Sequence, residues 1–442
     1  MVKNLHEIRD PIHVFVRYDS DERLVINSRP FQRLRHIHQL ALSSQVYPSA
    51  SHKRFEHSLG VMELAGRVFD VVTQEDRITD QIRKVIPEIS PGYKRDYWRR
   101  VLRMAALCHD IGHLPFSHAA EKELLPDGFS HEDLTRDLIL SEEMNEIWQG
   151  MTPQLRSEEI AKLALGPQKW KDGEFTTWET ILSEIIVGDA FGVDRMDYLL
   201  RDSYHLGVPY GKFDHFRLID TLCILPDSPT EKGGEPGEPA LGVITGGIHS
   251  AEALLLARYF MFSQVYFHPI RRIYDIHLMD FLKLWLPDGK FSTDLEKHLS
   301  LTDNEVWAAL LKASRDSKSP GHEHARKIVY HDHFHLLYSP PPADIAINSD
   351  AGKAVYEAAC NKFGEEFIRH DKHTQSSGVP NFPVSTRDER IASSISMSDV
   401  LQTLPVAKFD YVFISPHLLS KAGQWLEGEL EKIIQPEREA GS

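Results

Sequence analysis

Cysteine is scarce in this chain of 442 residues: the three present, Cys108, Cys223 and Cys360, show no CxxC spacing. An odd count without paired spacing argues against a disulfide framework. It fits a reducing compartment, so we expect a cytoplasmic protein. Cys108 lies within an apolar run and is expected to be a buried thiol rather than a nucleophile.

Long hydrophobic runs are also missing. The first residues, MVKNLHEIRDPIH, hold no apolar leader segment, so we expect no signal peptide. The most apolar helical stretch, AEALLLARYFMF, contains Arg258 and is too short to cross a bilayer. We therefore expect no membrane partner.

Positive charge is outweighed by negative charge. The 50 lysine and arginine residues face 65 aspartate and glutamate residues, which gives a formal net charge of −15. This balance argues against a protein that coats nucleic acid or binds anionic membranes. It does not exclude a small anionic ligand, because a local pocket of arginine and histidine can oppose the overall sign.

Internal repeats and long low-complexity segments are absent as well, and helical periodicity dominates the first two thirds of the chain. Apolar residues at three- and four-residue spacing predict helices over 56–75 and 97–112. FQRLRHIHQLAL predicts one basic amphipathic helix, and the stretch from TWETILSEII to DSYHLG predicts two helices interrupted near residues 188–192. Residues 249–285 are strongly helical, and the Gly- and Pro-rich segment 226–242 predicts a loop that leads into the strand LGVIT.

The character of the chain changes after about residue 290. FPVST and FDYVFIS predict a pair of strands, HDHFHLLY alternates like a strand, and RHDKH predicts the solvated end of a helix. We predict a mainly α fold, with a helical core over residues 1–290 and a smaller α+β portion over residues 291–442.

Histidine, by contrast, is plentiful, with 24 residues, which directs attention to metal or proton chemistry. The segment CHDIGHLPFSH places His109 directly beside Asp110. On a helix both can lean toward one ion and offer it a neutral nitrogen and an anionic oxygen. Further ligands must come from other segments, and His57 in RFEHSLG and Asp194 in VDRMDYLLRD are the candidates.

Three segments, RFEHSLG, LCHDIGHLPFSH and VDRMDYLLRDSYHLG, together resemble those of the HD-domain phosphohydrolases. FQRLRHIHQL and YPSASHKRFEHSLG are similar to the N-terminal signature of one branch, the deoxynucleoside triphosphate (dNTP) triphosphohydrolases of the SAM-and-HD-domain type and their bacterial relatives. The match runs from about residue 10 to about residue 280. It implies an HD-domain helical core and a metal held by His57, His109, Asp110 and Asp194.

The resemblance also implies a substrate site. Arg54, Arg195 and Arg258 would reach the phosphates, with arginine at position 195 where the family has lysine. The triphosphate and the scissile position would be lined by His113, His118 and His131, with either His118 or His131 as general acid. Glu121 would orient His118. The sugar would meet Gln39, Tyr198, Asp202 and Tyr266, with Asp202 on the 3′-hydroxyl and Tyr266 at the 2′ position.

An activator site is implied with changes. Gln32 and Arg35 match family residues that bind an activating nucleotide, but Asn27 stands where an aspartate reads guanine. Pro269 replaces a lysine, and LGVITGGIHSAE lacks the expected basic residues. A carboxylate accepts two hydrogen bonds from guanine and an amide does not, so the activator need not be GTP or dGTP, and the site is either altered or lost.

The expected activity is hydrolysis of dNTPs to deoxynucleoside and tripolyphosphate, for dNTP pool control or antiviral defence. The expected cofactor is one divalent ion (Mn, Fe, Mg or Zn), with further Mg on the triphosphate. A homo-oligomer, dimer or tetramer, is expected. The alternatives are another HD phosphohydrolase (a nucleotidase, a cyclic-nucleotide phosphodiesterase or a (p)ppGpp hydrolase) and a nuclease or nucleic-acid-binding regulator. GHEHARK and HDHFH resemble metal clusters, but we interpret them as structural because no further ligand stands in register.

Overall fold

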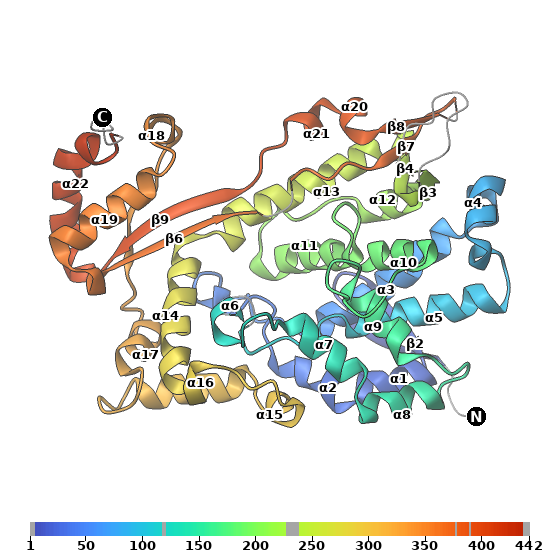
Figure 1. Cartoon of the computed structure of the whole chain (residues 1–442), viewed down its shortest axis with the longest axis horizontal. Coiled ribbons are helices and arrows are strands. Elements are labelled where there is room, and N and C mark those ends of the chain that lie inside the picture. Colours follow the sequence, from blue (N-terminus) through green and yellow to red (C-terminus); the bar gives the residue numbers. More distant parts are fainter. Residues whose placement is uncertain (1–4, 117–120, 227–237, 376–377, 389, 436–442) are drawn as a thin grey trace.

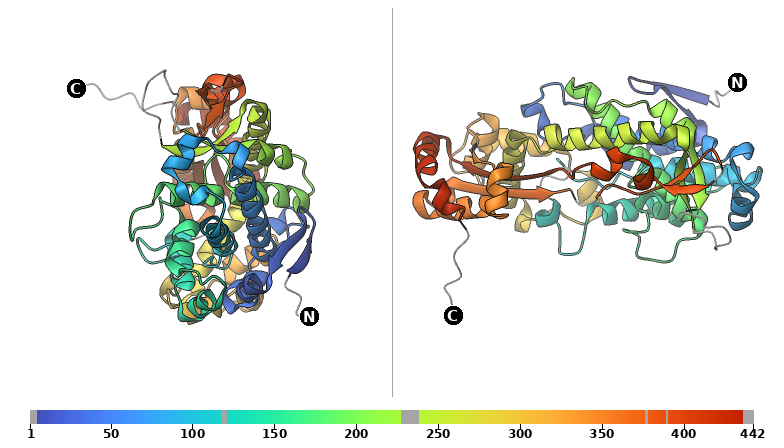
Figure 2. Two further views of the ribbon diagram at one scale, coloured as in Figure 1. Left: turned by 90° about the vertical axis from the view of Figure 1, so that its right-hand side faces the viewer. Right: turned by 90° about the horizontal axis from the view of Figure 1, so that it is seen from above.

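The computed structural model describes residues 5–116, 121–226, 238–375, 378–388 and 390–435. The chain is mainly helical, as predicted, with a smaller strand-containing C-terminal portion (Figure 1). Seen from above, the molecule is elongated, with the hairpin of β1 (Leu5–Asp10) and β2 (Val14–Asp19) near one end and α22 (Leu419–Ile433) at the other (Figure 2).

The first two thirds of the chain hold most of the helices. In chain order they are α1 (Ser20–Asn27), α2 (Arg29–Arg33), α3 (Arg54–Val72), α4 (Asp80–Val85), α5 (Tyr93–Cys108), α6 (Glu121–Leu124), α7 (His131–Ile139), α8 (Glu142–Gly150), α9 (Ser157–Leu165), α10 (Thr177–Val187), α11 (Val193–Leu206), α12 (His215–Thr221), α13 (Ile248–Met261) and α14 (Pro269–Trp285). The remaining helices are short, apart from α16, α19 and α22: α15 (Leu295–Leu299), α16 (Asp303–Ala313), α17 (His322–Val329), α18 (Pro342–Ile347), α19 (Ala351–Phe363), α20 (Ser394–Met397) and α21 (Asp399–Thr403).

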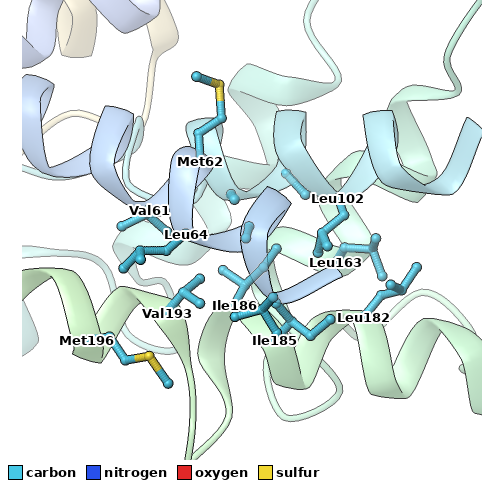
Figure 3. Close-up of a cluster of buried hydrophobic side chains, with 14 of the residues drawn as sticks. Val61, Met62, Leu64, Leu102, Leu163, Leu182, Ile185, Ile186, Val193 and Met196 are labelled. Carbon is cyan, nitrogen blue, oxygen red and sulfur yellow. The ribbon is translucent and has the colours of Figure 1, made fainter. Parts of the chain in front are cut away.

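Helix α3 is the centre of the helical half. It begins where the Glu56 carboxylate accepts the Lys53 backbone N–H at 2.8 Å, an N-terminal cap. Its residues are buried nearly all round, as expected for a helix enclosed by others. Figure 3 shows its apolar side chains meeting those of α5, α9, α10 and α11: Val61, Met62, Leu64, Leu102, Leu163, Leu182, Ile185, Ile186, Val193 and Met196.

A second apolar cluster lies beside the segment that follows the His-Asp pair. Leu114 and Phe116 pack there with α14 and with residues of α16 and α17. The Asp303 carboxylate, at the start of α16, accepts the Phe116 backbone N–H at 2.8 Å and the His38 backbone N–H at 2.7 Å. Residues from both sides of position 290 therefore hold the segment 113–116 in place.

The helix predicted over FQRLRHIHQLAL is wrong beyond its first turns. Helix α2 ends at Arg33, and a 3-10 turn, Leu34–His36, follows. His38 then forms an isolated antiparallel bridge with Lys53, the Gln39 N–H donates to the His52 carbonyl at 3.0 Å, and turns lead into a second 3-10 turn, Ser43–Gln45. The buried Arg33 guanidinium donates to the carbonyls of Leu301 and His113 at 2.8 Å. These contacts with distant segments outweigh local helix propensity.

In addition to the hairpin, the strands form two small sheets. The order is β3 (Leu222–Pro226), β4 (Pro239–Ile244), β7 (Pro383–Ser385) and β8 (Ile391–Ser393) in one sheet, and β5 (His335–Tyr338), β9 (Lys408–Ile414) and β6 (Ile368–Thr374) in the other. The strand after the Gly- and Pro-rich segment is confirmed as β4, whereas most of the predicted loop, residues 227–237, lies outside the described residues.

Two predictions for the C-terminal portion are wrong. FPVST and FDYVFIS are strands but do not pair: β7 lies between β4 and β8, and β9 between β5 and β6. RHDKH is not a helix end but the middle of β6. The strand was not predicted because its side chains are polar and show no apolar alternation. These side chains bond distant residues instead, His370 to Asp410 at 2.8 Å and Asp371 to Arg272 at 2.7 Å.

Helical boundaries elsewhere follow local chemistry. The predicted interruption near 188–192 is confirmed between α10 and α11, and the run 249–285 divides at a π-helical turn, Phe262–Tyr266, before Pro269 opens α14. Among the described residues, no helix has both the length and the apolar character needed to cross a membrane.

Candidate active site

Four side chains from three helical segments converge in the helical half. His57 lies in the first turn of α3, Asp194 in the first turn of α11, and His109 and Asp110 directly after α5. The Nε2 atom of His57 is 3.1 Å from an oxygen of Asp194 and 3.8 Å from one of Asp110. The Nε2 atom of His109 is 3.5 Å and 3.4 Å from oxygens of the same two carboxylates. The structure thus brings together the four predicted metal ligands.

The His-Asp pair lies just past the helix rather than on it, which corrects the sequence expectation. Helix α5 ends at Cys108, His109 is its C-cap, and a turn carries Asp110 to Gly112. A side chain at Gly112 would place its Cβ atom 2.3 Å from the Thr135 nitrogen and 2.4 Å from the His131 carbonyl. Glycine at this position therefore lets the turn pack directly on α7, which carries His131.

The two imidazoles are held with their Nε2 atoms toward the carboxylates. His57 Nδ1 donates to Asp197 at 2.8 Å, and His109 Nδ1 donates to the Ala106 carbonyl at 2.8 Å. A proton fixed on Nδ1 leaves the Nε2 lone pair for a metal ion. The Nε2 atom of His109 is buried and has no hydrogen-bond partner among the described residues, as expected of an atom that serves as a ligand.

The electrostatics of the cluster favour a cation. Burial disfavours a charged His57, but its hydrogen bonds to Asp194 and Asp197 outweigh burial and raise its pKa to about 10. Burial likewise opposes the charged form of His109, and the carboxylates of Asp110 and Asp194 raise its pKa. The site therefore attracts positive charge.

The donor set fits a divalent metal ion. Ligand atoms of His57, His109 and Asp110 all lie within 4.8 Å of one another. Two neutral nitrogens with carboxylate oxygens suit Mn, Fe or Zn, and a carboxylate-rich site also accepts Mg. The Nε2 atom of His109, which faces two carboxylates but makes no hydrogen bond to any described residue, supports this fit.

Asp110 also binds two groups outside the predicted ligand set, one through each carboxylate oxygen. Arg54 Nη1 donates to it at 2.5 Å, and His113 Nε2 lies 3.0 Å from its other oxygen. Burial opposes ionisation of Asp110, but His109, Arg54 and His113 together hold its pKa well below the usual range. Predicted phosphate-binding residues thus adjoin the metal ligands.

The predicted catalytic histidines form a stack. The His113 and His131 rings lie 4.0 Å apart at 19°, and His131 Nδ1 contacts the Glu121 carboxylate at 2.6 Å. Burial, then Arg54 and His131, hold the pKa of His113 well below its usual range, which keeps this ring neutral. Glu121, expected beside His118, is seen here to orient His131; His118 itself lies outside the described residues.

The two other predicted arginines lie close together. Arg195 Nη1 donates to the Gly188 carbonyl at 3.2 Å, and its Nη2 lies 3.3 Å from an Asp189 oxygen. Burial and then Arg195 lower the pKa of Arg258 to about 10. In the amide orientation that satisfies both groups, the Gln375 oxygen accepts from Arg258 at 2.7 and 2.8 Å.

The predicted sugar-binding residues also meet. The Tyr266 hydroxyl donates to Asp202 at 2.7 Å, and the rings of Tyr266 and Tyr198 are 6.1 Å apart at 75°. His52 Nε2 contacts the other oxygen of buried Asp202 at 2.7 Å. Gln39, whose backbone N–H bonds the His52 carbonyl, has a buried Oε1 without a hydrogen-bond partner.

The predicted activator residues lie on consecutive elements. Asn27 is exposed at the end of α1, and Gln32 lies in α2. Gln32 donates to the Ile26 carbonyl at 2.7 Å and accepts from Arg35 at 2.9 Å. The Arg35 guanidinium lies 3.5 Å from the Phe55 ring centre. Gln32 and Arg35 are therefore held in place by their mutual hydrogen bond and by the contact of Arg35 with Phe55.

Sequence reasoning missed the carboxylate behind His57. Asp197 is fully buried, as are Arg201 on the same helix and His13 from the N-terminal loop. The signal was present: Asp194, Asp197 and Arg201 recur at three- and four-residue spacing, which places them on one helix face. His52, the partner of Asp202, was missed as well.

Among the described residues, two further groups bring metal-type ligand atoms together, and one of them is Glu121, His131 and Glu132, beside the site itself. In the other, His277, Asp280 and His324, the last from GHEHARK, lie within 4.8 Å of one another. His277 Nε2 accepts the Phe334 backbone N–H at 3.3 Å, and Arg369 donates to Asp280 at 3.4 Å. Through these contacts the three residues help to hold α14, α17 and β6 together, which is a structural role.

Comparison with known proteins places this site in a class. A family model described as HD domain matches residues 54–202, and one described as HD associated region matches residues 213–330. HD domains bind a divalent metal ion, and His57, His109 and Asp110 form a possible site for it in this structure. The chain belongs to the HD-domain family of hydrolases and carries the HD-associated region of that family.

Relatives from an archaeon and a eukaryote match more than half of this chain. An uncharacterized protein of Methanocaldococcus jannaschii is 36% identical over 268 residues, 61% of this chain and 47% of its own length. The deoxynucleoside triphosphate triphosphohydrolase SAMHD1 homolog of Dictyostelium discoideum is 29% identical over 334 residues, 73% of this chain and 57% of its own length. The chain thus spans about half the length of these curated relatives. The crystal structure of a hypothetical protein from Aquifex aeolicus superposes with a TM-score of 0.76 at 33% identity and covers 96% of this chain and 100% of that one.

Proposed function

We propose that this HD-domain hydrolase is a metal-dependent dNTP triphosphohydrolase, which converts a dNTP and water into a deoxynucleoside and tripolyphosphate. The observation that carries the proposal is a row of side chains on α11. Asp194 at the metal site, Tyr198 and Asp202 follow one another at four-residue spacing. This spacing puts them on one face and spreads them over about 12 Å along the helix. A nucleotide can then have a phosphate at the first residue and its sugar near the last.

Cationic groups accompany this row. A triphosphate carries about four negative charges and needs several donors. Arg54 adjoins the metal ligands through Asp110, and Arg195 and Arg258 lie together beside Tyr198. An anion between the two arginines would relieve the repulsion that lowers the pKa of Arg258.

The residues around the scissile position suit proton transfer. His57, His109, Asp110 and Asp194 would hold the ion; when bound, it would stabilise charge on a phosphoryl oxygen and make water more acidic. The oxygen of water joins the α-phosphorus, the bond from phosphorus to the 5′-oxygen breaks, and the 5′-oxygen takes a proton. Glu121 fixes Nδ1 of His131, so His131 presents Nε2 on its other side as a general acid. His118 is the second candidate for this role.

Sugar selection rests on Asp202 and Tyr266. The Asp202 carboxylate is buried and held by His52 and Tyr266, so it is fixed as an acceptor for a 3′-hydroxyl. The Tyr266 ring would occupy the space of a 2′-hydroxyl. We also propose that the protein is a homo-oligomer and that a nucleotide activator binds near Gln32 and Arg35, which are hydrogen-bonded to each other.

Product analysis tests the proposal. The purified chain is incubated with each dNTP and NTP, singly and in pairs, with Mn²⁺ or Mg²⁺, and the products are separated by ion-exchange chromatography. We expect tripolyphosphate and deoxynucleoside from dNTPs. Orthophosphate or pyrophosphate would indicate another HD phosphohydrolase, and cleavage of polynucleotides would indicate a nuclease; either result would overturn the proposal.

A further inference from the structure

Behind the metal site lies a buried carboxylate whose hydrogen-bonding capacity is fully used. Asp197 Oδ2 accepts from His57 Nδ1 at 2.8 Å and from Arg201 Nε at 2.8 Å. Its Oδ1 accepts from His13 Nε2 at 2.6 Å and from Arg201 Nη2 at 2.9 Å. A carboxylate has about four acceptor positions, so all are occupied and its orientation is fixed.

The N-terminal loop completes this arrangement. Asp10, at the end of β1, accepts the backbone N–H groups of Ile12 and His13 at 2.8 Å each, which shapes the loop. The other oxygen of Asp10 accepts from Arg201 at 2.8 Å. The loop between β1 and β2 is therefore joined to α11 at the same point as His57.

The packing of α3 on α11 depends on this network. A Cβ atom at Gly60 would lie 1.9 Å from Asp197 Oδ1 and 2.5 Å from Arg201 Nη2. Gly60 stands one turn after His57 in RFEHSLG. Glycine there allows the carboxylate to reach beneath α3 and contact the back of the His57 ring.

We propose that Asp197 is a positioning residue of the metal site, and that His13 holds it in place. Asp197 keeps the proton of His57 on Nδ1, so that Nε2 presents its lone pair to the ion. Helix α11 then serves the ion twice, directly through Asp194 and indirectly through Asp197. This inference concerns the metal site of the proposed function but is independent of the substrate.

The Asp197→Asn variant tests the role with little change in shape. An amide has one oxygen, and its NH₂ group cannot accept from His57 Nδ1 or from Arg201. If the NH₂ group faces His57, the ring must accept through Nδ1 and carry its proton on Nε2, where the metal should bind. Loss of such an outer partner typically costs about 10–100-fold in metal affinity, and we expect a loss in this range for Mn²⁺.

Mn²⁺ affinity is measured on the full chain by isothermal titration and by the EPR signal of free Mn²⁺, with thermal unfolding recorded in chelator. Glu22→Gln is the matched control, because Glu22 is another buried carboxylate in the same helical half, bonded to Arg103 at 2.7 and 3.1 Å. We expect Glu22→Gln to lower the unfolding temperature without changing Mn²⁺ affinity. A folded Asp197→Asn protein that binds Mn²⁺ within two-fold of the parent would overturn the proposal, as would an equal loss of affinity in the control.

A second pair of variants decides the matter if Asp197→Asn does not fold. His13→Ala removes a donor to Asp197 without touching a ligand, and His13→Gln restores a donor. Weaker Mn²⁺ binding in His13→Ala that recovers in His13→Gln supports positioning, and parental affinity in His13→Ala contradicts it. Because the readout is metal binding, a chain that binds Mn²⁺ as expected but yields no tripolyphosphate would overturn the proposed function alone.

Discussion

In the metal half of the site, formed by His57, His109, Asp110 and Asp194, nitrogen and carboxylate oxygen atoms that would bind an ion lie 3.1–3.8 Å from one another, and neighbouring groups hold them in that arrangement. In the substrate half, formed by Arg195, Tyr198, Asp202, Arg258 and Tyr266, groups that would bind the nucleotide are themselves occupied by protein partners, such as Tyr266 by Asp202 and Arg258 by Gln375. The metal half is thus prepared for an ion, whereas several groups of the substrate half must exchange partners when a nucleotide binds.

The difference has a structural origin. The metal ligands are supported from behind by buried groups, Asp197 for His57 and the Ala106 carbonyl for His109. The arginines of the substrate half reach toward the loop after α10 and toward the C-terminal segment at Gln375. We therefore expect changes in the metal half to abolish activity together with metal binding, and changes in the substrate half to weaken catalysis with the ion retained.

The largest effect is expected from Asp110→Ala. This carboxylate contacts the ion site, Arg54 and His113, so its loss removes the ion and disturbs two further groups. We expect no bound Mn²⁺ and a fall in turnover of about a thousand-fold or more, because several kcal/mol of charge stabilisation disappear. Metal analysis and product assays measure both, and circular dichroism should show an intact helical fold, since the apolar core around α3 is unchanged. Asp76→Ala, at an exposed position, is the control. Parental turnover by a metal-free Asp110→Ala protein would show that the ion site is assigned wrongly.

A smaller effect should follow from Arg258→Ala. A hydrogen bond to a charged group contributes about 1.5–3 kcal/mol, so kcat/KM for a dNTP should fall about 10–100-fold. Mn²⁺ affinity should stay at the parental value. Gln375→Ala, which removes a protein partner of Arg258 but not the guanidinium, is the control and should retain activity. Loss of Mn²⁺ binding in Arg258→Ala would mean that the two halves are not separable.

The same contrast explains how far the sequence predicts this molecule. The convergence of His57, His109, Asp110 and Asp194 was predictable because a metal site needs particular ligand atoms, and the three segments that carry these residues have recognisable patterns. Helices α3 and α10 were predictable because their apolar residues recur at helical spacing. The hydrogen-bond partners of the site residues were not predictable. Nothing near Glu121 in the sequence indicates that it bonds His131 rather than His118, and nothing near Arg258 indicates that it bonds Gln375.

The wrong secondary-structure predictions fall in segments whose local structure is decided by contacts with residues far away in the sequence. The segment after Arg33 leaves its helix because buried hydrogen bonds to Leu301 and His113 hold it elsewhere. RHDKH forms a strand because β9, about forty residues later, pairs with it antiparallel, and the His370 side chain bonds the Asp410 carboxylate across the pair. Hydrophobic periodicity and secondary-structure propensity are properties of one segment by itself, so neither of them indicates which distant residues the segment will contact.

A still smaller effect is expected on sugar selection. The Tyr266 ring would fill the space of a 2′-hydroxyl, so the parent should hydrolyse dATP much faster than ATP. Tyr266→Ala should reduce this preference by about tenfold, the lower part of the range for one group in a pocket. Tyr266→Phe is the matched variant: it loses only the hydroxyl that donates to Asp202, keeps the ring, and should keep the preference. Steady-state rates on both nucleotides measure the ratio, and equal parental rates on dATP and ATP would remove this role for Tyr266.

The smallest effect concerns regulation, and it extends the comparison to a third region, the surface formed by Asn27, Gln32 and Arg35. Gln32 and Arg35 are already bonded to each other, so a nucleotide docking there meets a preformed group. Asn27 offers an amide, which can pair with several bases by turning over, where a carboxylate would select guanine. We expect hydrolysis of one dNTP to rise a few-fold when a second, non-guanine nucleotide is present. Because a ligand shared between subunits favours the assembled form, the same nucleotide should increase the mass measured by light scattering.

The Asn27→Asp variant sharpens this expectation. Restoring the carboxylate should shift activation toward GTP and dGTP, while Mn²⁺ affinity and the rate without activator stay at parental values, because Asn27 is exposed at the end of α1 and belongs to neither half of the active site. Rates in pairwise nucleotide mixtures measure the shift. Rates that are additive in all mixtures, with a mass that no nucleotide changes, would mean that this surface binds no activator. Activation of the parent by GTP and dGTP alone would mean that guanine is read by groups other than residue 27.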